Sequence, residues 1–311
     1  WSGSLQTLLR SGCALLSLTS PSARAQAAVW APGQLGQTLY QNDPHDDVRQ
    51  LLRQGKYAQA LPLVERGAAR NPRDPQMRFW QGFLYEQLGQ AKAAKPVYQA
   101  LIEEFPELPE PYNNLAVLNA AEGDLGTARQ LLEQACAVAP QAARPQLALA
   151  DLLEAQGNAP AALNQRLQMA QNMPAMMPLL ASGLARLAVQ QQRVDEVQAL
   201  LQTHALAHPS LDVMEALVVL DQAKGVTDIQ QRYATHLEKE PSMVAARLWL
   251  SHEPLQHESH RGLLERALER AAAPLKRYRC AACGFEAQQH FWQCPGCQAW
   301  DSYPPRRVEE L

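Results

Sequence analysis

A 34-residue period is the feature of this sequence that most restricts its fold. Three sets of positions follow it: a glycine (Gly55, Gly89, Gly123, Gly157), an alanine (Ala60, Ala94, Ala128, Ala162) and a proline (Pro72, Pro106, Pro140, Pro174). The glycine suits a break between two helices, the alanine allows the helices to approach closely, and the proline ends the second helix. The period therefore predicts a stack of helix pairs.

The amino-acid composition favours a helical fold and gives no reason to expect nucleic acid as a partner. Aromatic residues make up only 6% of the 311 residues, and alanine, leucine and glutamine, which favour helices, are abundant. The hydrophobic share of 47% is enough to form a sizeable core. A net charge of −3 gives no electrostatic reason to expect nucleic acid as a partner.

One repeat shows the pattern in most detail. Its characteristic residues resemble those of the tetratricopeptide repeat family: Trp80, Gly82, Tyr85, Gly89, Ala94, Tyr98 and Pro106. The resemblance covers residues 41–174, about four repeats, and implies a superhelical solenoid. Beyond it the interhelix glycine and packing alanine are lost, around Gln191 and Glu196. We expect residues 175–273 to form degenerate helical pairs that end in a capping helix from Arg261 to Ala272, because terminal repeats are atypical.

A cysteine cluster follows the helical part. It consists of two C-x2-C pairs separated by ten residues: Cys280, Cys283, Cys294 and Cys297. Two such loops can direct four thiolates at one centre, whereas two disulfides or unrelated thiols are the alternatives. We predict one metal ion, iron or zinc, in a rubredoxin-like module over residues 276–304 (the metal module), followed by a tail over residues 305–311. Four thiolates leave no open coordination position, so a structural role is favoured and iron electron transfer is the alternative.

The overall expectation is an all-α tetratricopeptide solenoid with a small metal module of the rubredoxin or zinc-ribbon type. The concave surface of such a solenoid holds a peptide or a partner helix, and the candidate partner-binding residues are Phe83, Glu86, Asn113 and Val117. Two alternatives remain. Phe79 and Phe83, four residues apart, would simply pack between helices, and Asn113 could be solvated or cap a helix.

Catalysis is not expected, and the chain is predicted not to be an enzyme. The segment from His252 to His257 approaches the H-E-x-x-H pattern of zinc proteases, but its histidines are five residues apart and Pro254 opposes a continuous helix. His290 could replace a thiolate, but four cysteines already complete the shell. The sequence contains no glycine-rich phosphate loop and no nucleophile in a recognisable setting.

The first forty residues predict a leader and a linker. A short apolar run from Gly12 to Thr19 follows Arg10, and Ala25-Gln26-Ala27 offers a small-x-small cleavage pattern. This is typical of a secretory signal peptide, with a disordered or weakly amphipathic leader as the alternative. Because Trp1 is not an initiator methionine, we expect a fragment or a processed form.

The metal module carries a second resemblance, to the lipopolysaccharide assembly protein B family. The matching residues are Tyr278, Arg279, Cys280, Cys283, Gly284, Phe285, Ala287, Trp292, Cys294, Pro295, Cys297, Ala299 and Trp300. The resemblance implies a non-enzymatic adaptor at the cytoplasmic face of the inner membrane. The implied partners are lipopolysaccharide-pathway enzymes and a membrane AAA+ protease, which the adaptor helps to destroy the deacetylase that commits precursor to lipid A. A homo-oligomer is also possible.

The N-terminal half favours a different compartment. Residues 1 to about 165, and residues 107–118 above all, resemble exported tetratricopeptide proteins. The alternative function is therefore a periplasmic scaffold for envelope assembly. We hypothesise that the chain is a composite, joined between about residues 160 and 178; a kink or poor helix packing there would support this hypothesis.

Overall fold

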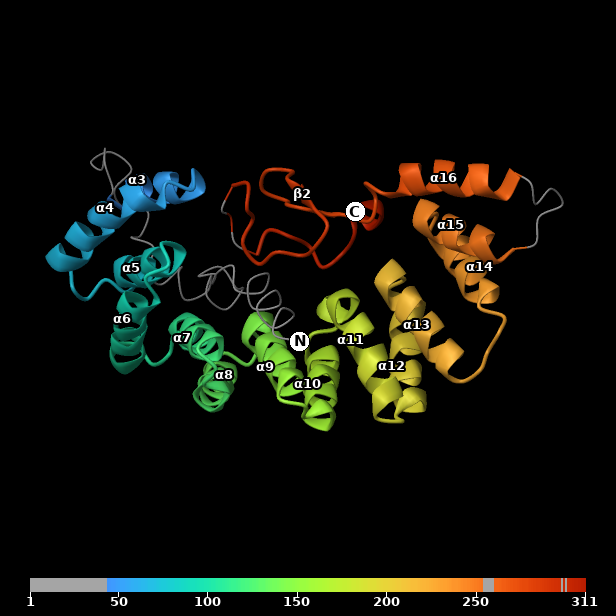
Figure 1. Cartoon of the computed structure of the whole chain (residues 1–311), viewed down its shortest axis with the longest axis horizontal. Helices are drawn as coiled ribbons and strands as arrows, with labels where there is room; N and C mark the ends of the chain where they lie inside the picture. Colours follow the sequence, from blue (N-terminus) through green and yellow to red (C-terminus); the bar gives the residue numbers. More distant parts are fainter. Residues whose placement is uncertain (1–43, 254–259, 298, 300) are drawn as a thin grey trace. The chain divides into compact units, whose positions relative to one another are not determined.

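The computed structural model describes residues 44–253, 260–297, 299 and 301–311 (Figure 1). The predicted leader and linker of residues 1–40 lie outside the described residues. The described chain divides into two units. The first unit holds the residues up to Gln156 together with Phe291–Ser302, and the second holds Gly157–His290 with Tyr303–Leu311.

The first unit is a series of antiparallel helices. They are α3 (Pro44–Arg53), α4 (Tyr57–Arg70), α5 (Pro75–Gln87), α6 (Ala91–Glu104), α7 (Pro109–Ala121), α8 (Leu125–Val138) and α9 (Ala143–Ala155). Each helix packs against the next one in the sequence (Figure 1). This is the arrangement of a helical solenoid, in which contacts are made between neighbours.

The periodic residues have the roles that their chemistry predicts. The four periodic glycines, at positions 55, 89, 123 and 157, all have a positive φ, between 66° and 91°, which an L side chain rarely adopts. The four periodic alanines are completely buried. Gly82 is required for a different reason, because a Cβ atom there would lie 2.7 Å from Cε1 of the buried Tyr98 ring.

The second unit continues with helices of similar length. They are α10 (Ala159–Asn172), the short 3-10 helix η1 (Pro174–Met176), α11 (Met177–Gln190), α12 (Val194–Ala207), α13 (Leu211–Ala223), α14 (Gln230–Lys239), α15 (Met243–His252) and α16 (Arg261–Ala272). α10 packs against both η1 and α11, so helix packing runs without a break through Pro174. This packing counts against a join at that point.

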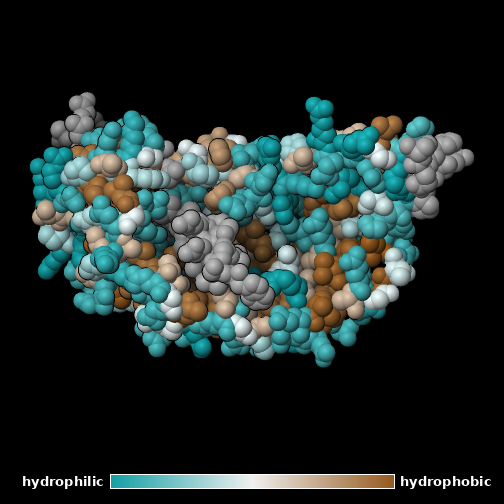
Figure 2. All heavy atoms as spheres, viewed as in Figure 1, coloured by the Kyte–Doolittle hydropathy of each residue, from teal (hydrophilic) through white to brown (hydrophobic). Residues whose placement is uncertain are grey.

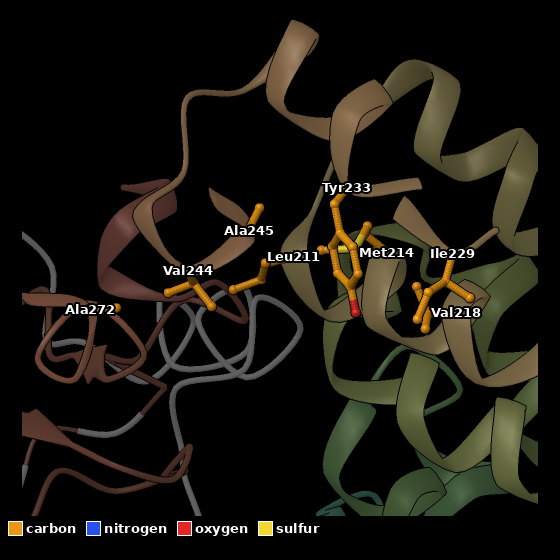
Figure 3. Close-up of a cluster of buried hydrophobic side chains, with 8 residues drawn as sticks. All are labelled: Leu211, Met214, Val218, Ile229, Tyr233, Val244, Ala245 and Ala272. Carbon is orange, nitrogen blue, oxygen red and sulfur yellow. The ribbon is translucent and has the colours of Figure 1, made fainter. Parts of the chain in front are cut away.

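The degenerate repeats keep a core although their repeat residues are lost. In the turn between α11 and α12, Gln192 has a φ of 56°, the left-handed conformation that glycine supplies elsewhere. A buried cluster then joins α13, α14, α15 and α16 (Figure 3). It consists of Leu211, Met214, Val218, Ile229, Tyr233, Val244, Ala245 and Ala272. Packing between neighbouring helices therefore replaces the repeat pattern as the stabilising feature.

The metal module is almost free of regular structure. Its two short strands, β1 (Tyr278–Arg279) and β2 (Glu286–Ala287), form an antiparallel pair in which Tyr278 lies opposite Ala287. A 3-10 helix, η3 (Val308–Glu310), lies in the tail. The predicted fold class is thus confirmed: an all-α solenoid with a small four-cysteine module.

On the face of the molecule shown in Figure 2, hydrophilic side chains predominate and hydrophobic ones appear in separate patches. Within the part of the chain that the structure describes, every helix is too short or too polar to cross a lipid bilayer.

Candidate metal centre

The four cysteines of the metal module come together at one point. Their Sγ atoms all lie within 4.8 Å of one another, and all four thiols are free of disulfides. Sulfurs bonded to a tetrahedral zinc at about 2.3 Å are roughly 3.8 Å apart, so only a small contraction is needed to bind the ion. Cys280 and Cys294 are buried, whereas Cys283 is exposed. The geometry of the cluster thus fits one metal ion.

The two C-x2-C loops have the same backbone closure. In the first loop the Cys280 amide donates to the Phe285 carbonyl at 2.9 Å, and in the second the Cys294 amide donates to the Ala299 carbonyl at 2.8 Å. Both bonds join a residue to the one five positions later. Gly284, with a φ of 78°, closes the first loop by donating to the Cys280 carbonyl. The two loops thus share a hydrogen bond between the amide of the first cysteine and the carbonyl five positions later.

Backbone donors point at one of the sulfurs. The amides of Gly296 and Cys297 donate to Cys294 Sγ at 3.3 and 3.5 Å. Such bonds favour a negatively charged thiolate, the form that binds a metal. The residues present therefore fit a metal ion bound by four cysteine thiolates. When bound, such an ion supplies a structural cross-link between the loops, because its shell is closed to water and substrate.

His290, four residues before Cys294, packs among aromatic side chains of the metal module and its flank. Its Nε2 donates to the Tyr303 carbonyl at 3.1 Å, and its ring lies edge-on to Tyr278 and Tyr303. Burial lowers the pKa of His290 to about 4, so the ring is neutral at pH 7. The His290 ring therefore packs against two buried tyrosines.

The candidate partner-binding residues are in varied surroundings. Phe83 is 2% exposed and its ring is edge-on to Tyr57, so it contributes to helix packing. Phe79 is also buried, and its ring is tilted by 41° against that of Tyr98. Glu86 accepts a hydrogen bond from the Tyr98 hydroxyl, and Val117 is half-buried on α7. A partner-binding role for Phe83, Glu86, Asn113 and Val117 stays a prediction.

Asn113 is the most unusual of these candidates. It is 1% exposed, and neither atom of its side-chain amide has a hydrogen-bond partner in the structure as described. Burial of unpaired amide atoms is costly, so this position is not explained by packing alone.

Sequence reasoning did not single out several charged residues. Glu110 is buried in the first turn of α7, where acidic residues are ordinarily solvated, and its flanking prolines were the available signal. Asp221 lies buried between three helices, and Glu309 and Glu310 of the tail bind helix ends far away in the sequence. The segment from Pro254 to His257, part of the near-protease pattern, lies outside the described residues.

The fold and the site together define a class of protein: a tetratricopeptide-repeat protein that carries a four-cysteine metal module. A family model described as rubredoxin metal binding domain matches residues 278–304, and a tetratricopeptide repeat model matches residues 45–109.

The chain also resembles proteins of known name over most of its length. The chain is similar to lipopolysaccharide assembly protein B of Escherichia coli, with 24% identity over 207 residues, 65% of this chain and 53% of that protein. The protein of the same name from Haemophilus influenzae is 24% identical over 188 residues, 58% of this chain and 48% of that protein. The expected resemblance is confirmed, and the chain spans about half the length of these relatives. A solved tetratricopeptide protein of Thermus thermophilus aligns with 24% identity, a TM-score of 0.40, and coverage of 58% and 97% of the two chains.

Proposed function

We propose that this chain is a non-enzymatic adaptor that binds other proteins and regulates lipopolysaccharide synthesis. In this proposal it presents the deacetylase that commits precursor to lipid A to a membrane AAA+ protease, at the cytoplasmic face of the inner membrane. The observation that supports it most is the combination of tetratricopeptide helices with a four-cysteine module, in a chain similar to lipopolysaccharide assembly protein B.

The chemistry of the site favours docking over catalysis. Four thiolates complete the coordination shell of zinc or iron, so the ion has no position at which to activate water or a substrate. Helical repeats expose an extended surface between their short, locally packed units, which suits protein partners. The metal then maintains the shape of a docking module.

A copurification experiment tests the adaptor function. The tagged chain is expressed in a Gram-negative host and its membrane-associated partners are identified by mass spectrometry. We expect the AAA+ protease and the deacetylase to copurify, and both to be lost with Cys280→Ser. Cys136→Ser is the matched control, because Cys136 lies on α8 outside the metal module and burial raises the pKa of its thiol to about 12. Recovery of neither protein with the unaltered chain would contradict the proposal.

Compartment and metal are tested separately. A reporter fused after Leu311 distinguishes the two sides of the inner membrane, and activity confined to the periplasm would favour the exported scaffold. Metal analysis of the purified protein distinguishes zinc from iron. A red, redox-active iron form would favour electron transfer instead, whereas colourless zinc protein agrees with the adaptor.

A further inference from the structure

The tail, residues 305–311, binds the N-terminal ends of two helices in the second unit. Glu310 accepts a hydrogen bond from the amide of Leu211, the first residue of α13, at 2.5 Å. Glu309 accepts from the amides of Met243 and Val244 at the start of α15, and from the Ser242 hydroxyl at 2.8 Å. The two adjacent glutamates thus each occupy one helix end.

These helix ends need an external acceptor. The first amides of any helix have no partner within it, and a carboxylate there also interacts favourably with the helix dipole. Ser210 stands at the N-cap of α13, but its buried hydroxyl makes no hydrogen bond within the described residues. In α15, Ser242 caps only the Ala245 amide. Glu310 and Glu309 therefore complete caps that the local sequence leaves unfinished.

Arg307 ties the same tail to the segment that leads into the metal site. Its guanidinium makes two bonds to the Asp212 carboxylate, at 2.7 and 3.1 Å, and donates to the Lys276 carbonyl at 2.7 Å. It also lies over the Tyr278 ring, 4.7 Å from the centroid. A partly buried, two-point arginine–carboxylate bond fixes both distance and orientation.

The backbone of the tail reinforces this connection. Val308 donates to the Arg277 carbonyl at 2.7 Å, next to strand β1, and Cys280 follows Tyr278 by two residues. At the other end of the first cysteine loop, the Tyr303 hydroxyl donates to the Phe285 carbonyl, which also accepts from the Cys280 amide. Residues on both sides of the first C-x2-C loop are therefore held by the segment from Tyr303 to Glu310.

We propose that the tail is a latch that positions the first cysteine pair, so that retention of the metal depends on the docking of Arg307, Glu309 and Glu310 on α13 and α15. These residues act on the site through the backbone of β1 and do not bind the ion. The proposal concerns the metal module itself and does not depend on the identity of any protein partner.

Metal release from the purified, zinc-loaded whole chain tests the latch. Zinc transfer to a chromophoric chelator is followed for Arg307→Ala and for the double variant Glu309→Gln/Glu310→Gln. We expect release to become about tenfold faster or more, as is typical when groups that orient metal ligands are removed, with unchanged helical circular dichroism. Arg270→Ala is the control; it removes an exposed arginine of α16, outside the tail, and should release zinc at the unaltered rate. Equal rates in all four proteins would overturn the proposal.

A second measurement needs no variant, in case a substitution prevents folding. Linkage requires that the metal and the latch stabilise each other to the same extent. Hydrogen exchange of the Leu211 and Val244 amides is compared with and without zinc. We expect removal of zinc to accelerate exchange at both amides while the amides within α11 keep their protection. Unchanged exchange at Leu211 and Val244 would overturn the latch.

Discussion

Glu110 shows how burial changes the protonation of a single carboxyl group. Glu110 is 4% exposed, and its Oε2 atom has no hydrogen-bond partner among the described residues. Burial raises the pKa of Glu110 from 4.5 to about 7, its own backbone and Arg144 oppose the change, and Asp301 adds to it. The folded state therefore holds a proton that the unfolded state has lost between these two values, so stability falls as the pH rises from 4.5 to 7.

We expect Glu110→Gln to remove this pH dependence. At pH 5 the variant and the unaltered chain should be similarly stable, because the carboxyl group is mostly protonated when folded. At pH 8 the variant should have the higher free energy of unfolding, by up to about 3 kcal/mol, since each pKa unit corresponds to roughly 1.4 kcal/mol. Urea unfolding of both proteins at the two pH values measures this. A constant difference between pH 5 and pH 8 would show that Glu110 does not titrate in this range.

Gly82 provides a steric prediction. Gly82→Ala places a Cβ atom 2.7 Å from Cε1 of Tyr98, whose fully buried ring cannot move without disturbing its bonds to Glu86 and Asn114. We expect a loss of about 1–3 kcal/mol, the usual cost of overpacking, measured by thermal unfolding. Gly126→Ala is the control on α8, where the added Cβ meets nothing closer than 3.7 Å. It should gain stability slightly, because alanine favours helices.

At the scale of elements, one carboxylate joins three helices. Asp221 on α13 accepts hydrogen bonds from Gln198 on α12 at 2.6 Å and from Arg232 on α14 at 2.6 and 3.1 Å. This network joins helices of the degenerate repeats, in which the packing alanine is lost. We expect Asp221→Ala to cost about 3 kcal/mol, because it leaves Gln198 and Arg232 without their acceptor.

Two comparisons make the Asp221 measurement specific. Asp221→Asn keeps one acceptor oxygen and should lose less stability than the alanine variant in chemical denaturation. Removing the exposed ion pair between Lys224 and Asp195 by Asp195→Ala should change stability by less than about 1 kcal/mol. Equal effects of Asp221→Ala and Asp195→Ala would show that the buried network contributes nothing special.

The elements also show what the sequence could predict. The period located the helix pairs because each glycine and alanine acts within one repeat, and the cysteine spacing predicted the metal site because each pair lies in one short loop. Gln192 could not be predicted as a left-handed residue, since nothing in its chemistry favours a positive φ as glycine does. The partners of Glu310 and Arg307 lie 99 and 95 residues away, and no local pattern indicates contacts of that range.

At the scale of the whole molecule, the metal module should unfold when the metal is removed, while the helices stay folded apart from the first turns of α13 and α15 that the tail caps. The module has two two-residue strands and no helix in its described part, so metal binding supplies most of its folding free energy. We expect a strong chelator or Cys294→Ser to make residues 278–304 sensitive to protease, with helical ellipticity at 222 nm largely kept. Cys136→Ser should leave the module resistant. Loss of the helical signal together with the module would contradict this expectation.

The docking of the tail also has a consequence for the order of folding. Contacts among the helices of each unit join helices that are adjacent or next but one in the sequence, such as α11 and α13, and such local contacts form early because their loops close at little entropic cost. Glu309 must instead find Met243, 66 residues away, and Glu310 must find Leu211, 99 residues away. During synthesis, α13 and α15 therefore exist for a time with open first turns, and they reach their final form only after the residues beyond the metal module have been made.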